Sequence, residues 1–134
     1  MHTILVVDDQ PEIRRLLGIT LQREFHVVEA VDGLSALEAV RRHQPAVVLL
    51  DVMMPGPLDG LGVLDRIRAD AATRHIPVAM LTARGQAADR ADAQARGANA
   101  YFTKPFSPTA VIGWVREAVA GIAAADDAAM PARP

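Results

Sequence analysis

The stretch TILVVD at Thr3–Asp8 decides the fold, because it is almost continuously apolar and ends on a carboxylate. AVVLLD at Ala46–Asp51 and PVAMLT at Pro77–Thr82 repeat the pattern, and each also ends on a polar residue. Strands with one face in water alternate apolar and polar residues, whereas continuous apolar runs are typical of strands buried on both faces of a parallel sheet. Shorter β-rich runs, HVVEA and AYFT, occupy His26–Ala30 and Ala100–Thr103. We therefore predict five strands.

Segments with helical periodicity separate the five runs. In the segment Pro11–Glu24, one helix face carries residues at i, i+3, i+4, i+7 and i+8, namely Ile13, Leu16, Leu17, Thr20 and Leu21. Further helices are expected at Leu34–Arg42, Leu61–Arg68 and Gln86–Arg96, and a last one begins at Pro108. Strict alternation of strands and helices with short connections predicts right-handed crossovers. The expected fold class is α/β: a flavodoxin-like, doubly wound (βα)5 fold whose five-stranded parallel sheet has the order 2-1-3-4-5.

Composition describes one ordinary domain and excludes several classes of protein. The chain has 134 residues, of which 51% are hydrophobic and 22% charged, with a formal net charge of −2. This charge indicates no direct nucleic-acid binding, and no apolar run approaches the ~18 residues that span a bilayer. Cysteine is absent, which excludes disulfides and thiolate metal sites. The N-terminus lacks the basic region of a secretory signal, so we expect a cytoplasmic protein without membrane insertion. The expected domain covers residues 1–122, and residues 123–134 form an Ala/Pro-rich tail that is expected to be disordered.

The strand runs lead into polar side chains that can carry chemistry. Asp8 ends the first run and Asp9 follows it, Asp51 ends the third, Thr82 ends the fourth, and Lys104 follows the fifth. The carboxyl ends of parallel strands meet at one edge of the sheet, and ligands bind there where the strand order reverses. We therefore expect these side chains to share one pocket. Lys104 is also the only lysine among the 14 basic residues.

Each of these residues has an ordinary structural interpretation as well. Asp9 could cap the following helix, Asp51 could belong to a turn, and Thr82 and Lys104 could be a plain strand end and a solvated loop residue. Together, however, adjacent carboxylates repel one another, and a fold tolerates this most readily where a cation binds. Oxygen ligands favour a hard cation such as Mg²⁺. The histidines are scattered without the spacing of metal ligands; they are His2, His26, His43 and His75.

Five motifs resemble those of the receiver domains of two-component response regulators, such as the single-domain chemotaxis regulators. They lie in family order between Ile4 and Ala120: ILVVDD at Ile4–Asp9, LLDVMMP at Leu49–Pro55, DG at Asp59-Gly60, PVAMLTA at Pro77–Ala83 and GANAYFTKPF at Gly97–Phe106. The stretch between Asp51 and Asp59 is longer than the family pattern by about one residue. Five motifs in order at family spacing are specific, whereas one alone would be weak.

The resemblance implies a chemical role for the acidic residues. Asp51 would accept a phosphoryl group, with Mg²⁺ as the cofactor. The implied ligands of the metal are Asp8, Asp9, Asp51 and the backbone carbonyl of Met53. The side chains of Met53 and Arg84 would flank the path of the water that hydrolyses the phosphorylated form, and neither can orient that water as an amide or a carboxylate would.

The resemblance also implies a switch. Thr82 would contact the phosphoryl oxygens, and Lys104 would pair with Asp51 at rest and with the phosphoryl group afterwards. Tyr101 would turn inward when Thr82 moves, and the peptide bond between Lys104 and Pro105 would be cis. The surface that changes would be formed by Gln86–Arg96, Ala100–Thr103 and the last helix.

The implied function is a phosphorylation-activated signalling switch that catalyses only its own phosphorylation and dephosphorylation. A sensor histidine kinase or a histidine phosphotransfer protein would supply the phosphoryl group. The modified chain would then control binding to a protein target or pass the phosphoryl group on. We expect a monomer at rest.

Three other functions remain open from the sequence. A haloacid-dehalogenase-like Mg²⁺-dependent phosphatase also uses an Asp nucleophile, but it needs a second Asp two residues later, where this chain has Met53. A flavodoxin-like flavin binder would need a hydroxyl-rich phosphate loop in place of Asp8-Asp9. A receiver-like module that binds its partner without phosphorylation would not require the complete set of acidic residues, Thr82 and Lys104.

Overall fold

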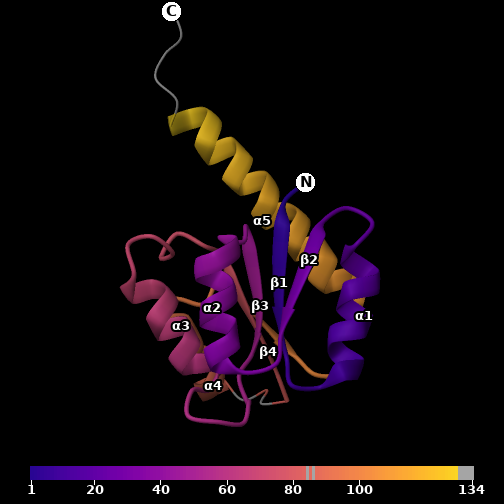
Figure 1. Ribbon diagram of the computed structural model, residues 1–134, viewed down its shortest axis with the longest axis vertical. Helices are drawn as coiled ribbons and strands as arrows, with labels where there is room; N and C mark the ends of the chain where they lie inside the picture. Colours follow the sequence, from indigo (N-terminus) through magenta and orange to yellow (C-terminus); the bar gives the residue numbers. More distant parts are fainter. Residues whose placement is uncertain (84, 86, 130–134) are drawn as a thin grey trace, which may run out of the picture.

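The chain folds into a five-stranded parallel sheet with helices on both faces (Figure 1). The computed structural model describes residues 1–83, 85 and 87–129. The strands are β1 (Thr3–Val7), β2 (His26–Ala30), β3 (Val47–Asp51), β4 (Val78–Thr82) and β5 (Ala100–Thr103). The helices are α1 (Pro11–Leu21), α2 (Gly33–His43), α3 (Gly60–Ala69), α4 (Ala87–Ala95) and α5 (Pro108–Ala129). The strand order is β2-β1-β3-β4-β5, which confirms the predicted fold class.

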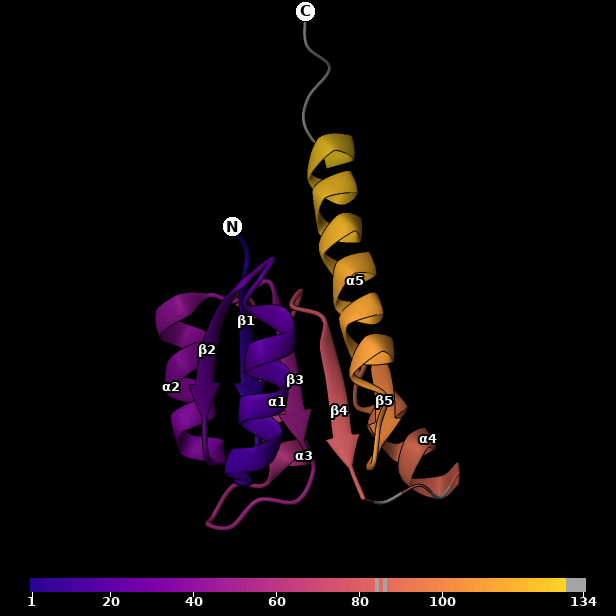
Figure 2. The same cartoon turned by 90° about the vertical axis from the view of Figure 1, so that its right-hand side faces the viewer.

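Each face of the sheet has its own hydrophobic core. On β1, Leu5 and Val7 pack with α2 and α3, whereas Ile4 and Val6 pack with α1 and α5. Every residue of β3 and β4 is buried. The continuous apolar runs in the sequence therefore correspond to strands covered on both sides, as predicted. Figure 2 shows α1 in front of the strands, α2 at the left beside β2 and α5 at the right beside β5.

The first helix differs from its sequence prediction. It ends at Leu21 rather than Glu24, and Leu16 is 40% exposed although the periodicity placed it on the buried face. The N-cap is Gln10, without a side-chain hydrogen bond, so Asp9 does not cap the helix. Instead, the backbone amide of Gln10 donates to Asp8 Oδ1 at 2.9 Å. The alternative of Asp9 as a helix cap is therefore wrong, and its carboxylate remains available for another role.

The last two helices lie at the margin of the fold. α4, which is rich in alanine, buries only Ala93 among its residues. α5 continues to Ala129, past the predicted domain end at residue 122, and its last turns project beyond the sheet (Figure 2). Within the described residues, no helix is long and apolar enough to cross a membrane.

Candidate functional site

Three carboxylates gather where β1 and β3 end side by side. The two strands pair in parallel with Val7 opposite Leu50, so Asp8 and Asp51 lie at the same edge of the sheet. Both are buried, at 0% and 4% exposure, whereas Asp9 is exposed. One carboxylate oxygen from each of the three residues lies within 4.8 Å of the others. Oxygen donors at this spacing fit a small hard divalent cation such as Mg²⁺, which keeps several waters beside one or two carboxylates.

The environment of Asp51 disfavours its negative charge. The pKa of this carboxyl is raised from 3.8 to about 6, chiefly by burial and next by the nearby Asp8 carboxylate. The Lys104 ammonium and the Met53 amide act in the opposite direction on the same pKa. The Met53 amide donates to Asp51 Oδ1 at 3.3 Å. Without a metal ion, the site therefore holds more negative charge than its single lysine neutralises.

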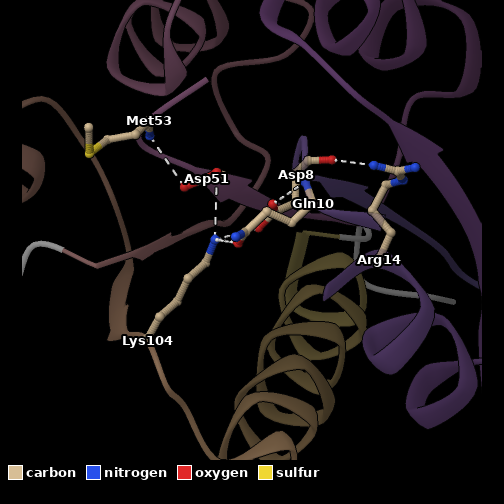
Figure 3. A network of polar contacts seen from close by, with 6 residues as sticks. All are labelled: Asp8, Gln10, Arg14, Asp51, Met53 and Lys104. Carbon is tan, nitrogen blue, oxygen red and sulfur yellow. Dashed lines mark hydrogen bonds and ion pairs between the residues drawn. The ribbon is translucent and has the colours of Figure 1, made fainter. Parts of the chain in front are cut away.

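Lys104 extends from the end of β5 into this acidic cluster (Figure 3). Its Nζ donates to Asp8 Oδ2 at 2.7 Å and to Gln10 Oε1 at 3.1 Å, and it lies 3.6 Å from Asp51 Oδ2. Lys104 is thus closer to Asp8 than to Asp51, the resting partner that the resemblance implies. The peptide bond from Lys104 to Pro105 is cis.

The other predicted residues lie around this cluster. Thr82 is fully buried at the end of β4, and its carbonyl accepts the Lys104 amide at 2.7 Å. Tyr101 lies half-buried on β5. Met53 is 52% exposed, and its side chain extends away from Asp51 (Figure 3). Arg84, the second residue expected to flank the attacking water, lies outside the described residues.

Two residues of the site were missed from the sequence. Gln10 contacts Lys104, and Arg14 donates through Nη1 to the Asp8 carbonyl at 2.8 Å while its Nε lies 3.2 Å from Glu29. Arg14 lies outside the apolar face that the helix periodicity predicts, but its side chain is only 18% exposed. The Arg14 guanidinium thus links β2 to the connection between β1 and α1, which carries Asp8 and Asp9. The one available signal was that both residues closely follow the paired aspartates in the sequence.

Comparison with known proteins identifies relatives along most of the chain. The family described as the response regulator receiver domain matches residues 4–116. RpaA of Synechocystis, a DNA-binding dual master transcriptional regulator, is 40% identical over 117 residues, which cover 87% of this chain and 48% of RpaA. The phosphate regulon transcriptional regulatory protein PhoB of Klebsiella pneumoniae is 41% identical over 114 residues, which cover 84% of this chain and 49% of PhoB. The chain spans about half the length of these curated relatives.

Solved structures agree with the sequence comparison. The receiver domain of the Francisella response regulator 1452 superposes with a TM-score of 0.85 at 27% identity, covering 91% of this chain and 99% of that one. The chain that has this sheet order, this acidic cluster and the lysine beside it thus matches one family over residues 4–116. The chain belongs to the family of response regulator receiver domains.

Proposed function

We propose that this chain is a signalling switch that accepts a phosphoryl group on Asp51 from a sensor histidine kinase or a histidine phosphotransfer protein. Receiver domains are signalling switches that take phosphate from histidine kinases and bind Mg²⁺ at an acidic pocket. The observation that carries the proposal is the cluster of Asp8, Asp9 and Asp51 with the Lys104 ammonium inside it. Its test is transfer of one acid-labile phosphoryl group from acetyl phosphate to the wild type and to Asp51→Asn.

The transfer step follows from the position of Asp51. A carboxylate oxygen attacks phosphorus in line, and the bond from phosphorus to the donor breaks, leaving an acyl phosphate on the protein. Negative charge lies on the equatorial oxygens of the transferring group, so catalysis consists mainly of positioning and charge neutralisation. Mg²⁺, held by Asp8, Asp9, Asp51 and the backbone carbonyl of Met53, would supply part of that neutralisation. Lys104, 3.6 Å from Asp51, supplies a positive charge from the chain itself.

The switch that follows depends on Thr82 and Lys104. Both contact the phosphoryl oxygens after transfer, and this draws the end of β4 and the loop after it toward the site. Tyr101 turns inward in response. α4 packs through one buried alanine, so it shifts at low cost. The surface of α4, β5 and α5 then presents a different face to a protein target, which makes the chain a two-state element biased by a local charge.

Millimolar Mg²⁺ is expected to stabilise the wild type. A ligand that binds only the folded state stabilises it by mass action, and a few times the dissociation constant corresponds to about 1 kcal/mol. The check is a urea unfolding curve with and without the metal, in parallel with Asp9→Asn, which removes one of the proposed ligands and should respond less. An unmoved wild-type curve would contradict the metal site.

Stability without metal is expected to depend on the protonation of Asp51. Its carboxyl has a raised pKa of about 6 in the folded chain, so the folded state binds this proton more tightly than the unfolded state does. The free energy of unfolding therefore falls as pH rises from about 4 to about 6, and this contribution stays at its lower value above that range. In EDTA, Asp51→Asn should raise the melting temperature at pH 7.

The rise in melting temperature caused by Asp51→Asn should become smaller as the pH is lowered toward 4. At pH 7, the ionised Asp51 is expected to lower the free energy of unfolding by roughly 1–3 kcal/mol, given a pKa shift of this size. The matched control is Glu38→Gln, an exposed carboxyl on α2, which should leave the melting temperature almost unchanged at every pH. A gain for Asp51→Asn that is equal at pH 4 and pH 7 would show that charge is not the cause.

The phosphorylated form is expected to persist for many minutes without a phosphatase. Hydrolysis needs a water in line with the bond between Asp51 and phosphorus, and the Met53 thioether is a poor hydrogen-bond partner for it. Met53→Asn should accelerate loss of phosphate by about tenfold, a part of the roughly 10²-fold that one badly placed water costs. Adding Arg84→Glu should accelerate the loss further. Decay of the wild type within seconds, or unchanged decay in both variants, would refute this.

A further inference from the structure

Arg90, in the middle of α4, reaches across to β5. Its guanidinium carbon lies 5.0 Å from the centroid of the Tyr101 ring. Nη1 donates to the Tyr101 carbonyl at 3.4 Å, and Nη2 donates to Thr103 Oγ1 at 3.2 Å. A cation over an aromatic ring is an attractive arrangement, and arginine can add hydrogen bonds in the plane of its head group. One side chain of α4 thus contacts two alternate residues of the strand that carries the proposed switch aromatic.

The packing between α4 and β5 makes this contact important. Only Ala93 of α4 is buried, and a surface groove of about 260 Å³ lies beside it, between the helix and Ala100 and Tyr101 of the strand. Apolar burial therefore contributes little to the position of the helix. In the described part of the chain, Arg90 joins α4 to β5 by two hydrogen bonds and by a cation over the Tyr101 ring.

Thr103 connects Arg90 to the acidic cluster. It lies opposite Thr82 in the register of β4 and β5, and it directly precedes Lys104. Gly85, which follows β4, also lies close to it, because a Cβ placed on Gly85 would be only 3.1 Å from Thr103 Cγ2. A movement of Lys104 or of Gly85 is therefore expected to displace the hydroxyl that Arg90 binds.

We propose that Arg90 is a positioning residue that latches α4 onto β5 in the unphosphorylated chain. The inference rests on the proposed function and deepens it. In the resting arrangement Lys104 lies nearer to Asp8 than to Asp51. A phosphoryl group on Asp51 draws Lys104 away, Thr103 follows along the backbone, and the hydrogen bond from Arg90 to Thr103 is lost. The latch holds the resting state, so weakening it favours the activated state.

The test uses beryllofluoride, a mimic of the phosphoryl group, with Mg²⁺ and the full chain. Arg90→Met keeps the length and apolar stem of the side chain and removes the charge and the donors. Its apparent dissociation constant for beryllofluoride should fall roughly threefold, the change expected when one exposed cation–π contact is lost. Trp114 reports binding by its fluorescence, since its ring packs edge-on against Phe102 of β5 at 6.4 Å. Arg90→Lys, which keeps a cation over the ring, should recover part of the wild-type value.

A second measurement needs no ligand. In Arg90→Met, the amide hydrogens of α4 should exchange several-fold faster than in the wild type, while those of β3 keep their rate. The control is Arg42→Met on α2, an exposed arginine far from β5 in sequence and topology, which should change neither measurement. Unchanged exchange in α4, or an unchanged dissociation constant in a protein whose wild type binds beryllofluoride, overturns the latch alone. A wild type that fails to bind beryllofluoride overturns the proposed function and, with it, the coupling through Arg90.

Discussion

Asp51→Asn is expected to abolish phosphorylation by acetyl phosphate, whereas the wild type should gain one acid-labile phosphoryl group. The amide oxygen of asparagine carries no full negative charge and cannot form a stable acyl phosphate. Asparagine has nearly the same shape as aspartate, so the buried position, 4% exposed, stays filled and the fold is kept. Intact mass after incubation with Mg²⁺ and acetyl phosphate gives the extent of labelling.

Because three carboxylates lie close together, the residue that accepts the phosphoryl group must be identified directly. Asp8 is fully buried and its Oδ2 is bound by Lys104, and Asp9 is exposed, so neither presents an acceptor oxygen in the same surroundings as Asp51. Borohydride reduction of the acyl phosphate followed by peptide mass analysis identifies the acceptor. Glu38→Gln should label as fully as the wild type. Label that persists in Asp51→Asn at the wild-type rate would remove Asp51 from its proposed role.

Gly60→Ala is expected to destabilise the fold by more than about 3 kcal/mol, at the upper end of the cost of overpacking. A Cβ on Gly60 would lie 1.9 Å from the Asp51 carbonyl oxygen and 2.8 Å from Val52 Cα. Both neighbours are backbone atoms at the end of β3, and neither can rotate away as a flexible side chain would. Gly60 is the first residue of α3, and its amide donates to the Val52 carbonyl at 3.0 Å.

Gly18→Ala is the matched control for this change. Gly18 lies inside α1, and nothing lies within 4 Å of a Cβ built there. Alanine favours helix over glycine, so this variant should gain roughly 0.5–1 kcal/mol. Urea unfolding followed by circular dichroism measures both variants against the wild type. If Gly60→Ala unfolds within about 1 kcal/mol of the wild type, the close approach of α3 to the acceptor strand is not a constraint on this fold.

Much of the architecture follows from the sequence pattern alone. Continuous apolar runs require two covered faces, and strict alternation with helices requires parallel strands, so the sheet and its order could be predicted. The grouping of Asp8, Asp9 and Asp51 follows from the same rule, because parallel strands bring their carboxyl ends to one edge. The DG pair at Asp59-Gly60 was noticed as a motif. Its physical reason, a helix start pressed against the Asp51 carbonyl, became visible only in the structure.

The partners of individual side chains were decided by tertiary structure. Lys104 lies nearest to Asp8, and it also binds Gln10, 94 positions earlier in the chain. Arg14 donates to the Asp8 carbonyl although it lies outside the predicted apolar face of its helix. Helix and strand periods give the face on which a residue lies, but they carry no information about which distant element stands opposite. The element that stands opposite depends on how α1, α4 and β5 pack together and on the rotamers that this packing allows. For this reason only the three-dimensional structure places Lys104 beside Asp8 and Arg90 over Tyr101.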